Sequence, residues 1–571
     1  MDILALFYQA ESTYVQVFQA ILRYLVPVIT LLLLWRCIRP LLTFRREPEI
    51  WAWLCLEDGR KLPITHWENI IGRHRRSDIV INFSTISKSH AVLTRYDDGS
   101  WTIADTGSKN GTCVNGKRIR IMPLTDEDVI TIGGVNMKLM PMNKRQEGRL
   151  AQLRTQAARP VSSLFNLLLL SVLQILCTIS YLMTSGGAYV SEITIGFSGI
   201  LICQWVLLIF YLCIKKPSFE VETIAFFLCT LGMAAIASVK PGEMTKQLLA
   251  MVLGLCVFLG MGWSLRDLER AKHMRRVAAV AGVLLLLITL VFGREYHGAK
   301  NWLIIGNMSF QPSELSKVCF VFVGASTMDR ILNKKNLIFF IGYTVLICAC
   351  LAVMNDFGTA LIFFVAFLLI AYLRSGSIGT IALACTSVGY AGVLVLRIAP
   401  HALRRFASWR HIWEDPFGAG YQQTRALMCI ASGGLFGLGA GNGWMHRIFA
   451  ADSDVVFATL TEEWGLIVAV LSVVCIIAMG LFSLRMSGIG RSSFYTIGSC
   501  TAAGILLVQT VLNVLGTVDI LPLTGVTFPF VSNGGSSMIG AWGLLAFIKA
   551  ADTRQNASFA VRQTKEDDAD E

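Results

Sequence analysis

Four carboxylates lie close together at the start of one apolar segment of this sequence. The stretch 445–467, MHRIFAADSDVVFATLTEEWGLI, holds Asp452, Asp454, Glu462 and Glu463. Two carboxylates as near as Asp452 and Asp454 can raise the pKa of one of them, which favours a general base near neutral pH, or they can hold a divalent cation together. The four carboxylates are therefore either ordinary polar residues at the end of a membrane helix or catalytic residues at a membrane surface.

Three more ionisable residues interrupt apolar stretches. Glu314 and Lys317 are three residues apart in FQPSELSK, so they share one face of a helix near its start. An ionised side chain facing lipid without a partner is costly. We therefore expect both to face a polar interior, and an ion pair that stabilises the helix end is the structural alternative. Asp356 follows an apolar run and precedes Phe-Gly-Thr, where an N-cap role and a catalytic role are both open.

The composition predicts that most of the chain lies in a membrane. Of the 571 residues 54% are hydrophobic and 15% are charged, whereas a soluble domain carries about a quarter charged residues. Apolar runs near the ~20 residues that cross a bilayer recur from 161 to about 548. The sequence therefore predicts a polytopic α-helical membrane protein. Basic patches with interleaved aromatic residues are not evident, so the net charge of +12 does not indicate a nucleic-acid partner.

Cysteine and glycine patterns exclude two other classes. The 15 cysteines are scattered, many lie in apolar runs, and no CxxC pair occurs. We interpret them as small hydrophobic residues that pack between helices, not as zinc or redox ligands. The glycine-rich stretches allow helices or loops to approach closely, and they lack the Gly-Lys-Ser/Thr of a nucleotide-binding loop.

Polar segments divide the chain and indicate its orientation. A transmembrane helix is expected in 1–43, where no cleavable signal peptide is evident, a polar block in 44–142, a basic linker in 143–160, and membrane helices from 161 to about 550 before a polar tail in 551–571. Basic residues that follow the first helix and fill the linker place the polar block in the cytoplasm. With about thirteen spans, the N-terminus and the Asp452–Asp454 loop then lie outside the cell and the C-terminus inside.

The polar block predicts an all-β sandwich with informative turns. Short alternating stretches are separated by Gly and Asp turns. The turns read Ile71-Gly-Arg73, Ser87-Lys-Ser-His90 and Ser108-Lys-Asn110-Gly111-Thr112, followed by a further Asn-Gly. This ordered pattern resembles the forkhead-associated (FHA) domain, a family that binds phosphothreonine peptides.

The FHA resemblance implies a role for each turn residue. It assigns the phosphate to Arg73 and Ser87, helped by Lys88 or Lys109, and the peptide backbone to Asn110, with His90 bracing the loop. A phosphate dianion needs guanidinium and hydroxyl donors, which agrees with these residue types. The implied partner is a phosphothreonine-containing protein. The alternative is a sandwich that binds no phosphopeptide and serves as a docking surface.

Six motifs of the apolar part occur in a fixed order. They are GAKNWL, FQPSELSK, DFGTA, GYQQ with ASGGLFGLG, DSDVVFATLTEEWGLI and LPLTGVTFPFVSNGGSS, and they span about residues 220 to 550. Together they resemble the SEDS family, to which FtsW, RodA and SpoVE belong. The resemblance implies a ten-helix core in 219–550, with the first helix and two adapter helices in 161–218 as about three extra helices. It also implies a peptidoglycan glycosyltransferase that polymerises lipid II outside the membrane, usually with a class B penicillin-binding transpeptidase.

The SEDS resemblance assigns catalytic roles to the opening residues. Asp454 matches the family's catalytic Asp and would deprotonate the acceptor hydroxyl. Asp452 stands where the family usually has His, and it would tune Asp454 or help it hold a divalent cation, Mg²⁺ or Mn²⁺. Glu314 and Lys317 match a pair that lines the central cavity, and Lys317 would meet the leaving pyrophosphate.

Further residues are expected around that cavity. Glu462, Asp356 and Ser536 are predicted to line it, and the loop residues Arg404 and Arg405 are alternative contacts for the pyrophosphate. A regular helix through 454–463 places Asp454 and Glu462 about 80° apart, on roughly one side.

Two other functions remain open from the sequence. A lipid II flippase or other transporter with an FHA regulator fits the many helices, although no inverted repeat is evident. The other alternative is a non-catalytic scaffold of the division or elongation machinery. Division, elongation and sporulation duties depend on the partner transpeptidase, so the sequence does not separate them.

Overall fold

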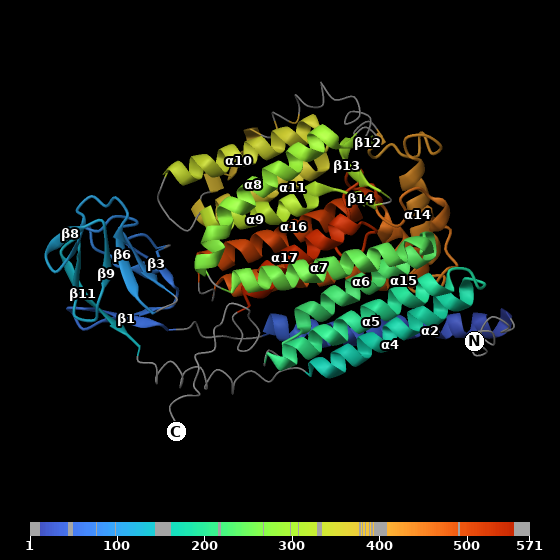
Figure 1. Ribbon diagram of the computed structural model, residues 1–571, viewed down its shortest axis with the longest axis horizontal. Helices are drawn as coiled ribbons and strands as arrows, with labels where there is room; N and C mark the ends of the chain where they lie inside the picture. Colours follow the sequence, from blue (N-terminus) through green and yellow to red (C-terminus); the bar gives the residue numbers. More distant parts are fainter. Residues whose placement is uncertain are drawn as a thin grey trace.

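The chain consists of a helical part and a β-sandwich that lies at one end of it (Figure 1). The computed structural model describes residues 12–552 except 44–49, 76, 97–98, 143–161, 215–217, 267, 297–298, 307, 328–333 and 489–491, and it describes 376–407 at scattered positions. The predicted linker 143–160, nearly all of the tail 551–571, and the loop residues Arg404 and Arg405 lie outside the described residues.

Thirteen helices of the described part matter for the site. They are α2 (Ser12–Thr43), α4 (Ser163–Thr184), α5 (Val190–Cys213), α6 (Glu220–Val239), α7 (Met244–Leu265), α8 (Leu268–Phe292), α9 (Pro312–Thr327), α10 (Lys334–Val353), α11 (Phe357–Ser375), α14 (Tyr421–Gly433), α15 (Val456–Ser487), α16 (Ser493–Thr517) and α17 (Gly535–Ala550). A three-stranded sheet of β12 (Arg294–Tyr296), β13 (Ala299–Ile305) and β14 (Met308–Phe310) joins α8 to α9.

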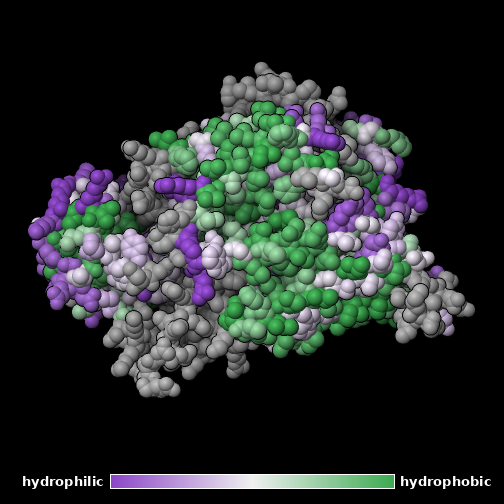
Figure 2. Space-filling model, viewed as in Figure 1, coloured by the Kyte–Doolittle hydropathy of each residue, from purple (hydrophilic) through white to green (hydrophobic). Residues whose placement is uncertain are grey.

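The helical part has the lengths and the surface of a membrane protein. Eight helices in the described residues are long and apolar enough to cross a bilayer, and two shorter apolar helices accompany them. Figure 2 shows a broad hydrophobic surface over the helices, with hydrophilic residues on the sandwich and at the opposite end. Large apolar side chains face outward, as Val28 does at 63% exposed, which is stable only against lipid. The predicted polytopic membrane protein is confirmed, and one predicted core span falls within 376–407.

The β-sandwich is formed by two antiparallel sheets, with one short parallel pair between β3 and β4. One sheet has the strand order β2-β1-β11-β10-β7-β8 and the other β4-β3-β5-β6-β9. Their bounds are β1 (Ala52–Leu56), β2 (Lys61–Ile64), β3 (Glu68–Gly72), β4 (Ile79–Val80), β5 (Ala91–Arg95), β6 (Trp101–Asp105), β7 (Thr112–Val114), β8 (Lys117–Ile119), β9 (Ile121–Leu124), β10 (Val129–Ile132) and β11 (Val135–Pro141). Alternate residues such as Leu54, Ile103 and Ile130 are fully buried between the sheets. The predicted all-β sandwich is confirmed.

The three helices that precede the core pack directly on it. α2 contacts α6 and α15, α4 contacts α6, and α5 contacts α6 and α7. Polar side chains form part of the contact: Tyr181 donates its hydroxyl to Glu463 at 2.7 Å, and Gln19 donates to Ser180 at 2.8 Å. Polar groups away from water need internal partners. The Tyr181 bond therefore fixes α4 on the core, and the Gln19 bond joins α2 to α4.

The sandwich touches the end of the helical part where α16 begins. Ser493 donates its hydroxyl to Glu68 at 2.6 Å, and the ring of Trp67 lies edge-on to Tyr495 at 6.5 Å between centroids. Trp67 is 7% exposed. α15 runs from Val456 at the far end of the helical part to Ser487 at the sandwich end. The Asp452–Asp454 loop therefore lies at the end opposite the sandwich (Figure 1).

Candidate active site

Asp454 lies in a loop and not on a helix. α15 begins at Val456, and the Asp454 amide donates to the carbonyl of Ala450 at 3.0 Å. The expectation that Asp454 and Glu462 lie on one side of a single helix is therefore wrong, because the helix starts two residues after Asp454. Asp454 is half-buried, and its carboxylate lies beside Gly525, where a Cβ would be 3.5 Å from Oδ2. A side chain at 525 would start in contact with the carboxylate.

A second loop, between α16 and α17, fixes the backbone around Asp454. Ser532 donates its hydroxyl to the Ser453 carbonyl at 2.6 Å, and the Asn533 amide donates to the Asp452 carbonyl at 2.8 Å. From α16, the buried Asn513 side chain donates to the Asp454 carbonyl at 3.0 Å. Carbonyls that turn away from regular structure need such donors. The position of Asp454 is thus set by residues about 60 to 80 positions further along the chain.

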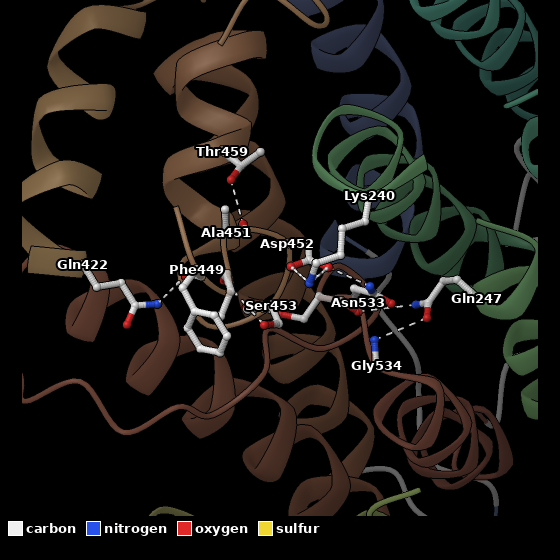
Figure 3. A network of polar contacts seen from close by, with 12 residues as sticks. Lys240, Gln247, Gln422, Phe449, Ala451, Asp452, Ser453, Thr459, Asn533 and Gly534 are labelled. Carbon is white, nitrogen blue, oxygen red and sulfur yellow. Dashed lines mark hydrogen bonds and ion pairs between the residues drawn. The ribbon is translucent and has the colours of Figure 1, made fainter. Parts of the chain in front are cut away.

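The Asp452 carboxylate is buried in an ion pair. It is 1% exposed, and Lys240 Nζ lies 3.0 Å from Oδ1 and 3.2 Å from Oδ2. Asn533 Nδ2 also donates to Oδ2 at 2.7 Å, as Figure 3 shows. A buried charge is tolerated when it is paired and hydrogen-bonded in this way. A direct catalytic role for Asp452 stays a prediction, and the structure shows its carboxylate engaged by Lys240 and Asn533.

Glu314 and Lys317 form the ion pair that their spacing allows. The two side chains come from the first turns of α9, and Lys317 Nζ is 2.8 Å from Glu314 Oε2. The side chains are 7% and 1% exposed, so both point into the helical part as expected. α17 packs closely here, since a Cβ on Gly540 would lie 3.0 Å from the Glu314 carbonyl. Their catalytic role stays a prediction.

Asp356 caps a helix and also joins the neighbouring elements. Its Oδ1 accepts the Thr359 amide at 3.1 Å in the first turn of α11, which is an N-cap. Its Oδ2 accepts from Asn301 at 3.0 Å and from Gln311 at 3.3 Å. The Gln311 amide donates to Ser536 Oγ at 3.0 Å. Gln311 therefore links Asp356 and Ser536 by a hydrogen bond to each of them.

One segment brings most of the predicted site residues together. Residues 521–540 contact the Asp454 loop through Gly525, Ser532 and Asn533, and they contact the start of α9 through Ser536 and Gly540. This segment is the LPLTGVTFPFVSNGGSS motif and the first turns of α17. It joins the Asp454 side of the site to the Glu314 side.

Glu462 lies apart from this group. Its Oε2 accepts the Met445 amide at 2.9 Å, and it is 1% exposed. It holds the glycine-rich segment 433–443, which packs on the kinked start of α15: Leu438 donates to the Glu462 carbonyl at 2.8 Å. The kink is at Gly465, with φ 87°. The close backbone approach expected of the glycines is present here, and a cavity-lining role for Glu462 stays a prediction.

Sequence reasoning missed three contributors. Lys240 and Asn513 lie 212 and 59 residues from their loop partners, so their spacing carries no signal. A lone amide in an apolar helix, such as Asn513, is nevertheless a usable signal, because a buried amide needs partners. The third is the β12–β14 sheet, whose strand β13 (Ala299–Ile305) includes most of the GAKNWL motif.

The residues around Asp454 do not build a metal site by themselves. In the described part of the chain no group of three or more His, Cys, Asp or Glu side chains is placed to hold an ion. The neighbouring Asp452 carboxylate already pairs with Lys240. Asp454 is therefore the one carboxylate proposed here as a ligand, and a divalent cation would take its other ligands from water, backbone oxygens or substrate phosphates.

The predicted phosphate-binding residues meet at one edge of the sandwich. The Arg73 amide donates to the Ser87 carbonyl at 3.0 Å, and the Lys109 amide donates to Ser87 Oγ at 3.1 Å. Asn110 donates its side chain to the Thr85 carbonyl at 2.7 Å. The side chains of Arg73, Lys88, Lys109 and Asn110 are exposed, so this edge of the sandwich is basic and open to a ligand.

His90 braces these loops from below. It is fully buried, and its Nδ1 accepts the Ser87 amide at 3.1 Å. Its Nε2 lies 3.1 Å from the Gly111 carbonyl, so Nε2 carries the proton of a neutral ring. The histidine thus ties the Ser87 loop to the Asn110 loop, which is the bracing role expected of it.

The architecture defines a multi-pass helical membrane protein with polar, carboxylate-bearing loops at one end and an FHA-type sandwich at the other. Residues 228–557 match the cell cycle proteins FtsW, RodA and SpoVE, and residues 69–133 match the FHA domain. Because that first match covers more than half of the 571 residues, the chain belongs to the FtsW/RodA/SpoVE family. Both resemblances found in the sequence are confirmed.

Two curated relatives and one chain of a solved structure match more than half of this chain. The probable peptidoglycan glycosyltransferase FtsW of Tolumonas auensis is 31% identical over 361 residues, which cover 59% of this chain and 93% of that protein. The peptidoglycan glycosyltransferase RodA of Mycobacterium tuberculosis is 28% identical over 327 residues, covering 53% and 69%. A chain from a solved peptidoglycan synthase complex is 23% identical with a TM-score of 0.49, covering 59% of this chain and 98% of that one.

Proposed function

We propose that this chain is a peptidoglycan glycosyltransferase that polymerises lipid II into glycan strands at the outer face of the plasma membrane. Its membership of the FtsW/RodA/SpoVE family supports the activity. The observation that carries the mechanism is the half-buried Asp454, which α16 and the loop between α16 and α17 hold in place, beside a segment whose Gly540 packs against Glu314. We take Asp454, Glu314 and Lys317 as parts of one site at the end of the helices opposite the sandwich.

In the proposed reaction Asp454 is the general base. Its carboxylate takes the proton from the 4-hydroxyl of the acceptor GlcNAc, and that oxygen attacks the anomeric carbon of the donor. The new carbon–oxygen bond forms as the bond from the anomeric carbon to undecaprenyl diphosphate breaks, and the diphosphate leaves with the electron pair. Lys317 is the proposed cation for the diphosphate, and Glu314 holds it in place through the 2.8 Å ion pair.

The proposed orientation places this region outside the cell. The N-terminus then lies outside, and the sandwich and the C-terminus lie in the cytoplasm, as the basic loops indicate. The sandwich and the Asp454 loop lie at opposite ends of the helices, which this orientation requires.

The cytoplasmic sandwich is proposed to bind a phosphothreonine-containing protein and so regulate the enzyme. Arg73, Ser87, and Lys88 or Lys109 would take the phosphate, and Asn110 the peptide backbone. Their common position on one braced edge supports this role. The second proposed partner is a class B penicillin-binding transpeptidase, which would cross-link the glycan product.

A divalent cation, Mg²⁺ or Mn²⁺, is proposed as a companion of the substrate diphosphate beside Asp454, because a single carboxylate holds such an ion only together with water or phosphate oxygens. Calorimetry of the purified chain with Mn²⁺ should show no tight binding without lipid II. Polymerisation should fall with EDTA and return with Mg²⁺ or Mn²⁺. Tight Mn²⁺ binding to the substrate-free chain, lost in Asp454→Asn, would contradict this and establish a resident ion.

The deciding experiment is lipid II polymerisation by the purified full chain in detergent or proteoliposomes. Asp454→Asn keeps the size of the side chain and removes the base, so we expect a loss of 10²-fold or more, on the order of what general bases contribute. Gel analysis of the glycan product measures it. Wild-type product lengths and rates from Asp454→Asn would rule out Asp454 as the base. Transport of lipid II without any glycan product would instead favour a flippase.

A further inference from the structure

Lys240 reaches the active-site loop from outside every motif of the sequence. It is the C-cap residue that directly follows α6, and its amide still donates to the Ile236 carbonyl at 2.8 Å. Its side chain is 52% exposed, while the Asp452 carboxylate that it contacts is 1% exposed. The ammonium therefore sits at the surface and covers a buried carboxylate (Figure 3).

The contact of Lys240 with Asp452 is one step from the proposed base. Asp452 binds Asn533 twice: its Oδ2 accepts from Nδ2 at 2.7 Å, and its carbonyl accepts the amide at 2.8 Å. These two bonds join the loop that carries Asp454 to the loop between α16 and α17. Gln247 of α7 supports that second loop, because its Oε1 accepts the Gly534 amide at 3.3 Å. Lys240 at the C-cap of α6 and Gln247 of α7 thus hold the contact between the Asp454 loop and the loop between α16 and α17.

We propose that Lys240 is a positioning residue of the proposed glycosyl transfer, which acts through Asp452 to hold the Asp454 loop. The inference rests on the proposed function for its kinetic readout. An ionised carboxylate as buried as Asp452 is stable only with a compensating cation, and Lys240 supplies it. The ionised carboxylate in turn accepts the Asn533 amide group, which closes the two loops around Asp454.

This assignment also gives Asp452 a role. Its two oxygens point to Lys240 and Asn533, so it serves as the link between a helix end and a loop. A displacement of about 1 Å in a reacting group can cost on the order of 100-fold in rate. The link is therefore expected to govern kcat while leaving the affinity for lipid II unchanged.

The test compares four variants of the full chain by steady-state polymerisation kinetics. Lys240→Met keeps the length of the side chain and removes its charge, and we expect kcat to fall about tenfold with KM within twofold. Lys240→Arg should restore most of kcat. Asp452→Asn should lose a similar amount, and the double variant Lys240→Met/Asp452→Asn should lose no more than either single one, because both remove the same link.

A matched control and an activity-independent measurement accompany the kinetics. Lys246 pairs with Glu243 at 2.9 Å at the same end of the molecule, with both side chains about half exposed, so Lys246→Met should behave as the wild type. Hydrogen exchange of peptides covering 450–455 and 532–535 should accelerate in Lys240→Met and not in Lys246→Met. This readout holds for a chain that makes no glycan, so it separates the positioning role from the proposed function.

Three results would overturn the proposal. A rise in KM with unchanged kcat would show that Lys240 contacts the substrate directly. Losses that multiply in the double variant would show that Lys240 and Asp452 act separately. Exchange in both loops equal to that of the wild type would show that Lys240 holds nothing. A fully active Asp454→Asn chain would instead refute the proposed base and leave the exchange result standing.

Discussion

At the scale of single residues, the site is a set of carboxylates with different duties. Asp452 is paired with Lys240, Glu314 with Lys317, and Asp356 caps α11. Asp454 is half-buried on a loop and faces Gly525. Carboxylates thus serve structure in several places, and only Asp454 carries the proposed proton transfer.

The cap on α11 gives a stability prediction. Asp356→Ala removes the acceptor for the Thr359 amide and for the Asn301 and Gln311 side chains. We expect about 1 kcal/mol or more of lost stability, since N-cap removal costs about that much. Thermal unfolding in detergent measures it. Asp356→Asn keeps an oxygen for the cap and serves as the control, and a loss equal to that of Asp356→Ala would argue against capping.

The FHA-type sandwich gives a prediction about pH. Burial raises the pKa of Asp105, but hydrogen bonds from Ser108, Thr112 and Gly107 outweigh it, so its pKa lies below the ordinary value. A carboxyl group with a lowered folded-state pKa stabilises the fold above its unfolded pKa and loses that contribution as the pH falls through the folded value. The sandwich should therefore lose stability below about pH 4.

Calorimetry of the full chain between pH 7 and pH 3 measures that loss through the unfolding transition of the sandwich. Asp105→Asn should start less stable at pH 7 and depend less on pH. An Asp105→Asn chain with the full pH dependence of the wild type would assign the effect to other groups.

At the scale of elements, Gly465 allows the kink near the start of α15. Gly465 has φ 87°, and a Cβ there would lie 2.3 Å from the Leu435 carbonyl. Gly465→Ala should cost more than about 2 kcal/mol, because it combines a strained φ with a backbone clash. Gly480 lies in the same helix with nothing within 4 Å of its Cβ position. Gly480→Ala should be neutral or slightly stabilising, and thermal unfolding compares the two variants.

The elements also show what a sequence can and cannot predict here. The sandwich, the apolar spans and the His90 brace follow from local patterns, because alternation, span length and turn residues are local. Local patterns do not predict that α15 starts after Asp454. They also do not predict the contacts of Lys240 and Asn513, because these contacts join residues 212 and 59 positions apart. The pairing of Asp452 with Lys240 in particular has no sequence signal, because Lys240 follows another helix and lies 212 residues earlier in the chain. The expected tuning of Asp454 by Asp452 stays a prediction.

At the scale of the whole molecule, the sandwich contacts the helices near one end of β3, and the proposed phosphate-binding residue Arg73 lies at the other end. Glu68 and Trp67 contact α16, whereas Arg73 follows the last residue of β3. Trp67→Ala should therefore loosen the attachment and keep phosphothreonine-peptide binding. Arg73→Ala should weaken phosphothreonine-peptide binding and leave the attachment unchanged.

Two measurements separate these effects. Fluorescence anisotropy with a labelled phosphothreonine peptide should show a loss of about tenfold or more in affinity for Arg73→Ala, because charge-assisted bonds to phosphate are strong. Hydrogen exchange in 493–497 should accelerate for Trp67→Ala alone. Loss of peptide binding in both variants would show that the two ends of β3 are not independent.

The length of β3 bears on how far a phosphorylated partner in the same membrane has to extend to reach the proposed phosphate site. Five strand residues rise about 16 Å in total, so the phosphate site is displaced by about that much from the contact with Ser493. An extended chain covers at most about 3.3–3.6 Å per residue. For a partner whose membrane helix ends at the level of Ser493, we expect the phosphothreonine at least about five residues beyond the helix end. Tether length would then be a criterion for selecting partners in addition to the phosphorylated motif.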